Sequence, residues 1–138
     1  MTRVEKALQY HKQGYNCGQA VFCSFVDLMD IDEKTALKLS HPLGRGLANL
    51  REVCGVIIAM SLVLGTKLGS DNPKDMEARN TLFNKVKEFS QEFEKEYGSI
   101  ICRNLILERK DNPNIKSKPC SEYVKFCVEL LDNYLSEM

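Results

Sequence analysis

The sequence predicts an all-α fold, a single-domain helical bundle of about five to seven helices around a buried central helix. Apolar residues recur at the three- and four-residue spacing of amphipathic helices, and no segment shows the alternation of a half-buried strand. Residues 53–64 are apolar nearly all round, so a helix formed there must be wrapped by others. With 138 residues, we expect one domain over residues 1–138.

Helix signals follow one another along the first half of the chain. The spacing of Val4, Ala7, Leu8 and His11 predicts an amphipathic helix over residues 2–12, which Gly14 ends. Asn16 is a good N-cap for a helix over residues 17–29, and Asp32 for one over residues 33–40. Pro42 and the glycines at residues 44 and 46 then break the chain, and the central helix is expected over residues 48–68.

The second half begins with a turn, GSDNPKD, in which Asp71 or Asn72 is a candidate cap and Pro73 suits the first helical position. A long helix is expected over residues 74–97, ended by Gly98. Its inward stripe is expected to contain Met76, Leu82, Phe83, Val86, Phe89, Phe93 and Tyr97. A short helix through Cys102 and Leu105 follows, then the polar loop ERKDNPNIKSK, then a last helix that Ser117 caps and that ends near residue 136.

Composition excludes several classes of protein. The 19 basic and 19 acidic side chains balance and form no long run, which disfavours a nucleic-acid groove or an anionic membrane surface. The first residues lack an apolar signal region, and the central apolar stretch is shorter than the about 20 residues of a membrane span. We therefore expect a cytoplasmic protein whose six cysteines are reduced. Six reduced cysteines are more typical of catalytic, metal-binding or buried thiols than of a disulfide framework.

Three cysteines, Cys17, Cys102 and Cys120, lie at predicted helix starts, where free N–H groups and the helix dipole lower a thiol pKa. Cys54 is expected in the first half of the central helix beside Gly55. A glycine inside a helix costs about 1 kcal/mol relative to alanine, which indicates a close approach of another backbone or a bound group there.

The cysteine spacing leaves two chemistries open. No CxxC pair exists, which disfavours thioredoxin-type dithiols and the common zinc ribbons and ferredoxin clusters. Four single cysteines that converge suit either a relay of thiols that form disulfides or a Cys₄ zinc or iron–sulfur site. Cys23 and Cys127 are expected to be core or secondary thiols, and any cysteine can also serve as a small apolar residue.

Other polar residues have weaker signals. Gly44, Arg45 and Gly46 with Arg51 can form an anion site, but a surface loop is the favoured interpretation because glycines punctuate loops. The two histidines, His11 and His41, are expected to be a packed residue and a helix-end cation, and a Cys–His nucleophile pair is a minor hypothesis.

The chain resembles the small redox proteins of the C_GCAxxG_C_C family. The matching segments are GYNCGQAV, PLGRGLANLREVCGVIIAMSLVLG, YGSIICRNL and KPCSEYV, in family order. The resemblance implies that Cys17, Cys54, Cys102 and Cys120 are the four characteristic cysteines. The family's Cys-Gly-Ala-x-x-Gly segment here has Val56 and Ala59 at its small positions, which disfavours a large planar cofactor near Cys54.

The leading hypothesis is therefore a cytoplasmic thiol redox protein. Its four characteristic cysteines would carry out reversible thiol/disulfide electron transfer, with the thiols at helix starts attacking and Cys54 resolving. Thiol–disulfide oxidoreductase-like activity is one form this can take, with a redox partner that the sequence does not identify. The alternatives are a zinc or iron–sulfur binding module that uses the same four cysteines, and a helical interaction protein, with a homodimer as one arrangement.

Overall fold

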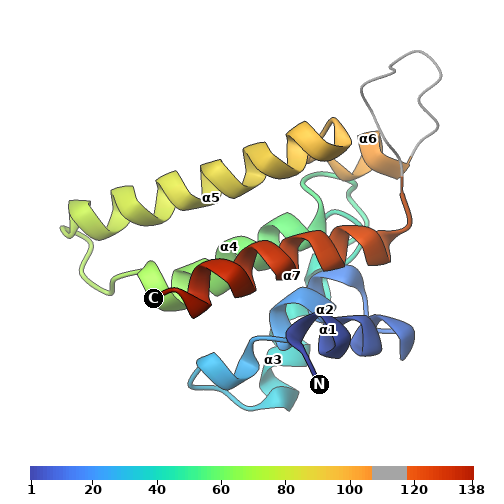
Figure 1. Ribbon diagram of the computed structural model, residues 1–138, viewed down its shortest axis with the longest axis horizontal. Coiled ribbons are helices and arrows are strands. Elements are labelled where there is room, and N and C mark those ends of the chain that lie inside the picture. Colours follow the sequence, from blue (N-terminus) through green and yellow to red (C-terminus); the bar gives the residue numbers. More distant parts are fainter. Residues whose placement is uncertain (107–117) are drawn as a thin grey trace.

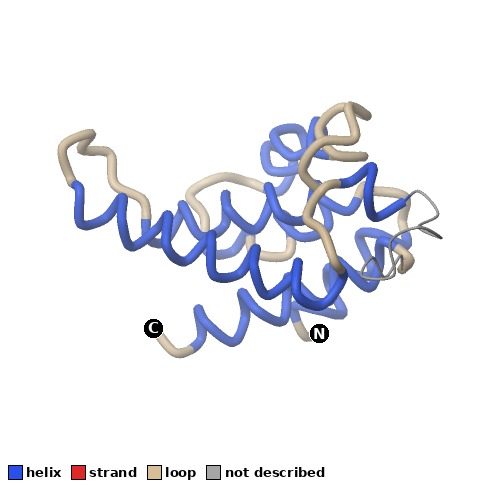
Figure 2. Tube along the Cα trace, turned by 90° about the horizontal axis from the view of Figure 1, so that it is seen from above, coloured by secondary structure: helices blue, strands red, loops and turns tan. Residues whose placement is uncertain are grey.

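The computed structural model describes residues 1–106 and 118–138, and it confirms the all-α prediction. Within these ranges there is no strand, only an isolated antiparallel bridge between Val53 and Ile101 (Figure 2). The elements are α1 (Arg3–Lys12), α2 (Cys17–Cys23), the 3₁₀ turn η1 (Val26–Leu28), α3 (Glu33–Ser40), the 3₁₀ turn η2 (His41–Leu43), α4 (Gly55–Leu68), α5 (Met76–Tyr97), α6 (Cys102–Ile106) and α7 (Cys120–Ser136).

The central helix is α4, which packs against α2, α5 and α7 (Figure 1). Val56, Ala59, Met60, Val63 and Leu64 on this helix are all completely buried, so the prediction of a wrapped, apolar helix is confirmed. Helices α4 and α7 run in the same direction, and their first residues lie at the same end of the bundle (Figure 1). No helix of the described ranges combines the length and the apolar surface that a membrane span needs.

The predicted caps hold the first helices in place. Asn16 Oδ1 accepts a hydrogen bond from the Gln19 backbone N–H at 2.9 Å, and Gln19 Oε1 accepts from the Asn16 N–H at 3.0 Å. This reciprocal capping box satisfies two N–H groups that a helix start would leave unpaired. Asp32 caps α3 through the Thr35 N–H, and Gly98 ends α5 with a left-handed φ of 93°.

The central helix begins at Gly55, not near residue 48, so its predicted start was wrong. Residues 44–52 form a compact loop in which Arg45, Leu47, Ala48, Asn49 and Arg51 have positive φ. Its backbone pairs with itself, as in the hydrogen bond from the Glu52 N–H to the Gly46 carbonyl at 3.0 Å. A right-handed helix is impossible there because these residues have the opposite backbone hand.

Other predicted helix boundaries also differ from the observed ones. The second helix ends at Cys23 rather than continuing to residue 29, and α5 begins at Met76 with Asp75 as its cap. The predicted cap Ser117 and most of the predicted polar loop lie outside the described residues. The inward stripe of α5 is buried at Phe89, Phe93 and Tyr97, but Met76 and Phe83 are about half exposed, so the prediction was wrong for these two.

Candidate functional site

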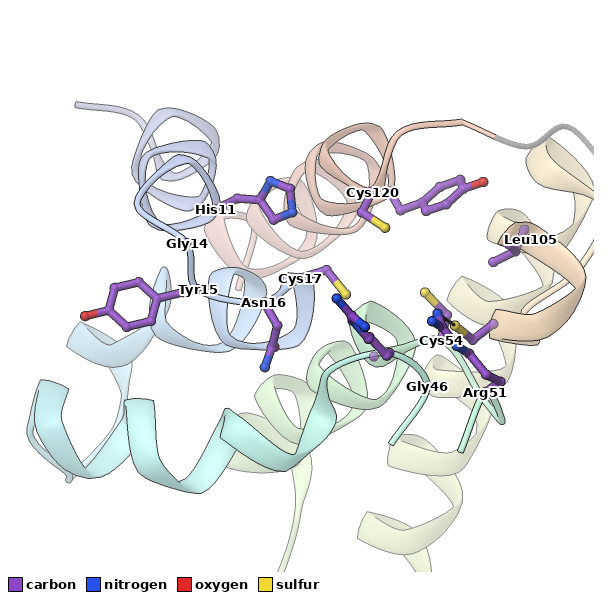
Figure 3. Close-up of a pocket in the computed structure, with 14 residues that line it drawn as sticks. His11, Gly14, Tyr15, Asn16, Cys17, Gly46, Arg51, Cys54, Leu105 and Cys120 are labelled. Atoms are coloured by element: carbon purple, nitrogen blue, oxygen red, sulfur yellow. Dashed lines mark hydrogen bonds between the residues drawn. The ribbon is translucent and has the colours of Figure 1, made fainter. Parts of the chain in front are cut away.

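Four helix starts meet at one cavity of about 310 Å³, and each carries a cysteine (Figure 3). Cys17, Cys102 and Cys120 are the first residues of α2, α6 and α7. Cys54 is the residue directly before α4, in the N-cap position, so its predicted place inside the central helix was wrong. The four cysteines that the sequence analysis singled out thus line the same cavity, although Cys17 and Cys120 are 103 residues apart in the chain.

The short β-bridge places two of these cysteines. Cys54 and Cys102 are the residues that follow Val53 and Ile101, the two members of the bridge. The Cys54 N–H donates to the Ile100 carbonyl at 2.7 Å, and the Cys102 N–H donates to the Glu52 carbonyl at 2.6 Å. Both side chains are almost completely buried, with 5% and 6% of their surface exposed. They therefore form the deep part of the cavity wall.

Two glycines bring Cys17 close to the start of α4. A Cβ on Gly18 would lie 2.5 Å from Leu43 Cβ, and a Cβ on Gly55 would collide with the Leu43 carbonyl oxygen. The same position on Gly55 is 3.5 Å from Cys17 Sγ. The prediction that Gly55 marks a close backbone approach is confirmed, although this glycine begins the helix instead of interrupting it.

Cys17 and Cys120 both line the cavity, and their sulfur atoms point into it (Figure 3). Hydrogen bonding with Cys17 lowers the pKa of Cys120 to about 6, against the opposing effect of its partial burial. The same interaction, followed by burial, raises the pKa of Cys17 well above its ordinary value, because its proton is shared with the Cys120 sulfur. Of the two, Cys120 is the more exposed residue and the one whose pKa is lowered.

The deep cysteines differ from this pair. Burial raises the pKa of Cys54 to about 12, although the backbone N–H groups of Val56 and Ile57 act in the opposite direction. Cys102 Sγ accepts a hydrogen bond from Arg51 Nη1 at 3.7 Å. The expectation that a helix start lowers the thiol pKa is therefore wrong for Cys17, since bonding to Cys120 and burial outweigh the helix dipole there.

The glycine-rich loop belongs to this site. Arg45, Gly46 and Arg51 line the cavity, and the two arginine charges contribute to the lowered pKa of Cys120. Gly46 has a φ of 68°, and a Cβ on it would lie 2.5 Å from Cys102 Cβ, so the loop packs directly on the cysteine. The segment is an exposed loop, as the sequence interpretation favoured, but its arginines also border the cavity, which that interpretation did not include. The sequence signal that could have placed this loop at the site was its two arginines beside the glycines at residues 44 and 46.

Three aromatic or imidazole side chains complete the wall: His11, Tyr15 and Tyr123. Sequence reasoning placed His11 in helix packing and did not select the tyrosines. His41 is not among the described lining residues. Cys23 and Cys127 are completely buried away from the cavity, as expected for core thiols.

Within residues 1–106 and 118–138, no group of three or more His, Cys, Asp or Glu side chains is arranged to hold a metal ion. A Cys₄ site needs all four sulfurs at about 2.3 Å from one metal. The shared cavity thus brings the thiols near one another without forming a metal-binding cluster in the described part of the chain.

The comparisons with known proteins give one match. Residues 15–134 match the family described as "Putative redox-active protein (C_GCAxxG_C_C)". The searches of curated proteins and of solved structures gave no match. The matched range contains all four cysteines of the cavity and the glycine-rich loop over residues 44–52 with its two arginines. Because the match covers most of its length, the chain belongs to the C_GCAxxG_C_C family of redox-active proteins.

Proposed function

We propose that this protein is a thiol redox protein in which Cys17, Cys54, Cys102 and Cys120 carry out reversible thiol/disulfide electron transfer. The observation that carries the proposal is the convergence of these four thiols on one cavity that two arginines also line, with Cys120 its more exposed and more acidic thiol. A thiolate next to a second thiol is the arrangement that disulfide exchange needs, because the first thiol attacks and the second resolves.

The reaction begins at the more exposed thiol. The Cys120 thiolate attacks one sulfur of a substrate disulfide, whose S–S bond breaks as a mixed disulfide forms. The substrate's first thiolate leaves and takes a proton from solvent. Cys17 then gives up its proton and attacks Cys120 Sγ, which releases the second substrate thiol. The protein ends with a Cys17–Cys120 disulfide, oxidised by two electrons, and the substrate ends as two thiols. An external dithiol reverses the same steps.

The buried thiols extend this exchange inward. The Cys17 thiol lies beside Gly55, the residue after Cys54, and the charge of Cys54 raises the pKa of Cys17 further. Cys54 in turn interacts electrostatically with Cys102 and Cys120. In this proposal Cys54 is the resolving partner for a disulfide that has formed at the cavity mouth, and Cys102 is the thiol next to it. The whole set can then hold more than one pair of electrons.

The test is intact-mass measurement with disulfide mapping on anaerobically purified protein, before and after mild oxidation. We expect the loss of two hydrogens first, in a bond that maps to Cys17 and Cys120. Loss of two further hydrogens at Cys54 and Cys102 is expected under stronger oxidation. The matched control is the Cys23→Ala, Cys127→Ala double variant, which should oxidise as the unmodified protein does because both residues lie outside the cavity.

Other outcomes have defined meanings. If no cavity cysteine forms a disulfide while Cys23 or Cys127 does, the proposal is wrong. A mass increment that leaves on denaturation would instead identify the protein as a metal or iron–sulfur binding module. A protein that neither oxidises nor carries an increment would be a helical protein whose cysteines are structural.

A further inference from the structure

The cavity is positively charged apart from its thiols. Arg45 and Arg51 are among its lining residues, and no Asp or Glu is among the described ones. Neither arginine forms an ion pair with a carboxylate of the described residues. Among the described residues, the side-chain partner of Arg51 is the Cys102 sulfur at 3.7 Å. Two guanidinium groups therefore border a cavity whose described lining contains no carboxylate.

The backbone that carries these arginines is strained. Arg45 and Arg51 both have left-handed φ, at 55° and 60°, with three further non-glycine residues of the same hand between them. A left-handed φ is unfavourable for a residue with a Cβ, because the Cβ approaches the following carbonyl oxygen. Such strain is found at ligand clamps, where the chain must aim particular side chains. In this loop the strained residues include the two that place positive charge on the cavity wall.

The rest of the molecule supplies no general attraction for anions. Its formal net charge is zero, so long-range steering by the whole protein is small. A preference for negative ligands at this cavity would consequently come from the two arginines themselves. Guanidinium groups bind carboxylates through paired N–H donors, and they stay charged throughout the range in which thiols exchange.

We infer that the substrate of the redox site is a small disulfide that carries an anionic group, such as a carboxylate, which Arg45 and Arg51 bind while Cys120 attacks the S–S bond. This inference rests on the proposed function and specifies its substrate class. A cavity of about 310 Å³ is at the lower end of small-molecule sites, so it suits a compact disulfide rather than a folded protein partner.

The chemistry is a thiol–disulfide exchange with charge recognition added. Cys120 forms a bond to one substrate sulfur, the substrate S–S bond breaks, and an anionic thiol leaves with a proton from solvent. Cys17 displaces the second anionic thiol as the protein disulfide forms. Without the arginines, a thiolate reacts more slowly with an anionic disulfide, because the two negative charges repel each other. The inferred role of the loop is to offset this repulsion, so that the anionic disulfide reacts faster than the others.

The test compares three disulfides of similar length: dithiodipropionate with two carboxylates, bis(2-hydroxyethyl) disulfide with none, and cystamine with two ammonium groups. Second-order rate constants for Cys120 oxidation are measured at pH 7 and low ionic strength, and each is divided by the rate constant of a small neutral thiol with the same disulfide. We expect the normalised rate for dithiodipropionate to exceed that for cystamine by about tenfold or more. The difference should shrink as salt is added.

Variants assign the preference to the loop. In Arg45→Gln, Arg51→Gln protein the difference should fall to about threefold or less, since the local positive charge is gone. Arg79→Gln on α5 removes the same kind of charge outside the cavity lining and should leave the preference unchanged. The salt series on the unmodified protein gives an independent answer if the loop variant fails to fold.

The results separate the two proposals. Equal normalised rates for all three disulfides, with no salt effect, would overturn the substrate class while leaving the thiol redox function intact. A faster normalised reaction with cystamine would also overturn it. Failure of every disulfide to oxidise Cys120 and Cys17 would instead overturn the proposed function, and the substrate inference with it.

Discussion

Helices α2 and α7 each carry two cysteines, and the two members of each pair lie in different surroundings. Cys17 and Cys120 begin their helices at the cavity, whereas Cys23 ends α2 and Cys127 lies two turns inside α7. Burial raises the pKa of both inner thiols, and that of Cys127 lies well above its ordinary value. The position of a cysteine along a helix, more than the helix that carries it, thus separates a cavity-lining thiol from a packed one.

The physical reason is where each helix meets other chain segments. The starts of α2, α4, α6 and α7 converge, so their first residues have neighbours with polar groups and a cavity beside them. In the inner turns, Cys23 Sγ contacts Ser40 Oγ at 3.7 Å, and Cys127 is completely buried. In the first setting the pKa of one thiol, Cys120, is lowered, whereas burial raises the pKa of both thiols in the second.

The largest expected effect is in alkylation rates. At pH 7 we expect iodoacetamide to modify Cys120 at least about a hundredfold faster than Cys127, because Cys120 is exposed and ionised and Cys127 is neither. Peptide mass spectrometry over a time course measures both rates in one sample. Denatured protein is the control, in which the two rates should converge. Similar rates in the folded protein would remove the distinction between the two settings.

The next effect is on the pH profile of Cys120. Its pKa of about 6 means that alkylation should reach half its plateau near pH 6, with the thiolate present above that pH and protonated below it. In Cys17→Ala the midpoint should move upward toward the ordinary value of about 9, because the largest stabilising interaction is lost.

The matched variant for that profile is Cys17→Ser, which keeps a hydroxyl donor and should hold the midpoint closer to that of the unmodified protein. The two profiles are compared on the Cys120 peptide alone. An unchanged midpoint in Cys17→Ala would show that the arginines, rather than the neighbouring thiol, set the acidity of Cys120.

A stability effect sharpens the comparison within α4. Gly55→Ala should destabilise the fold by about 1 to 3 kcal/mol, because the added Cβ collides with the Leu43 carbonyl. Gly65→Ala at the other end of the same helix should stabilise it by up to about 1 kcal/mol, since nothing lies within 4 Å of the new methyl. Urea unfolding measures both. Equal effects would mean that the cavity end is no more tightly packed than the far end.

The smallest effect concerns the strained loop. Ala48 is exposed and has a φ of 49°, so Ala48→Gly should stabilise the protein by about 0.5 to 1 kcal/mol. The same change at Ala59, buried in α4, should destabilise it by about 1 kcal/mol or more. Thermal unfolding of the two variants compares them directly. A destabilising Ala48→Gly would show that the left-handed backbone of this loop is not strained.

Local signals predicted the fold class and several element boundaries. Asn16, Asp32 and Gly98 act within one turn of their own position, so the helices that they begin or end were visible in the sequence. The apolar surface of residues 55–68 predicted a wrapped helix in the same way. The segment after residue 43 was misread because neither propensity nor periodicity identifies a run of left-handed non-glycine residues.

The sequence by itself predicted, through helix-start signals and the family resemblance, the four cysteines that line the cavity, and it placed three of them at helix starts. Only the tertiary structure decided that Cys120 is the acidic thiol, that Cys54 caps its helix, and that Arg45, Arg51 and His11 line the same cavity. A thiol pKa depends on burial and on groups distant in the chain, which local sequence does not specify. Helix caps and periodicity depend on neighbours a few residues away, and the local sequence does specify those neighbours.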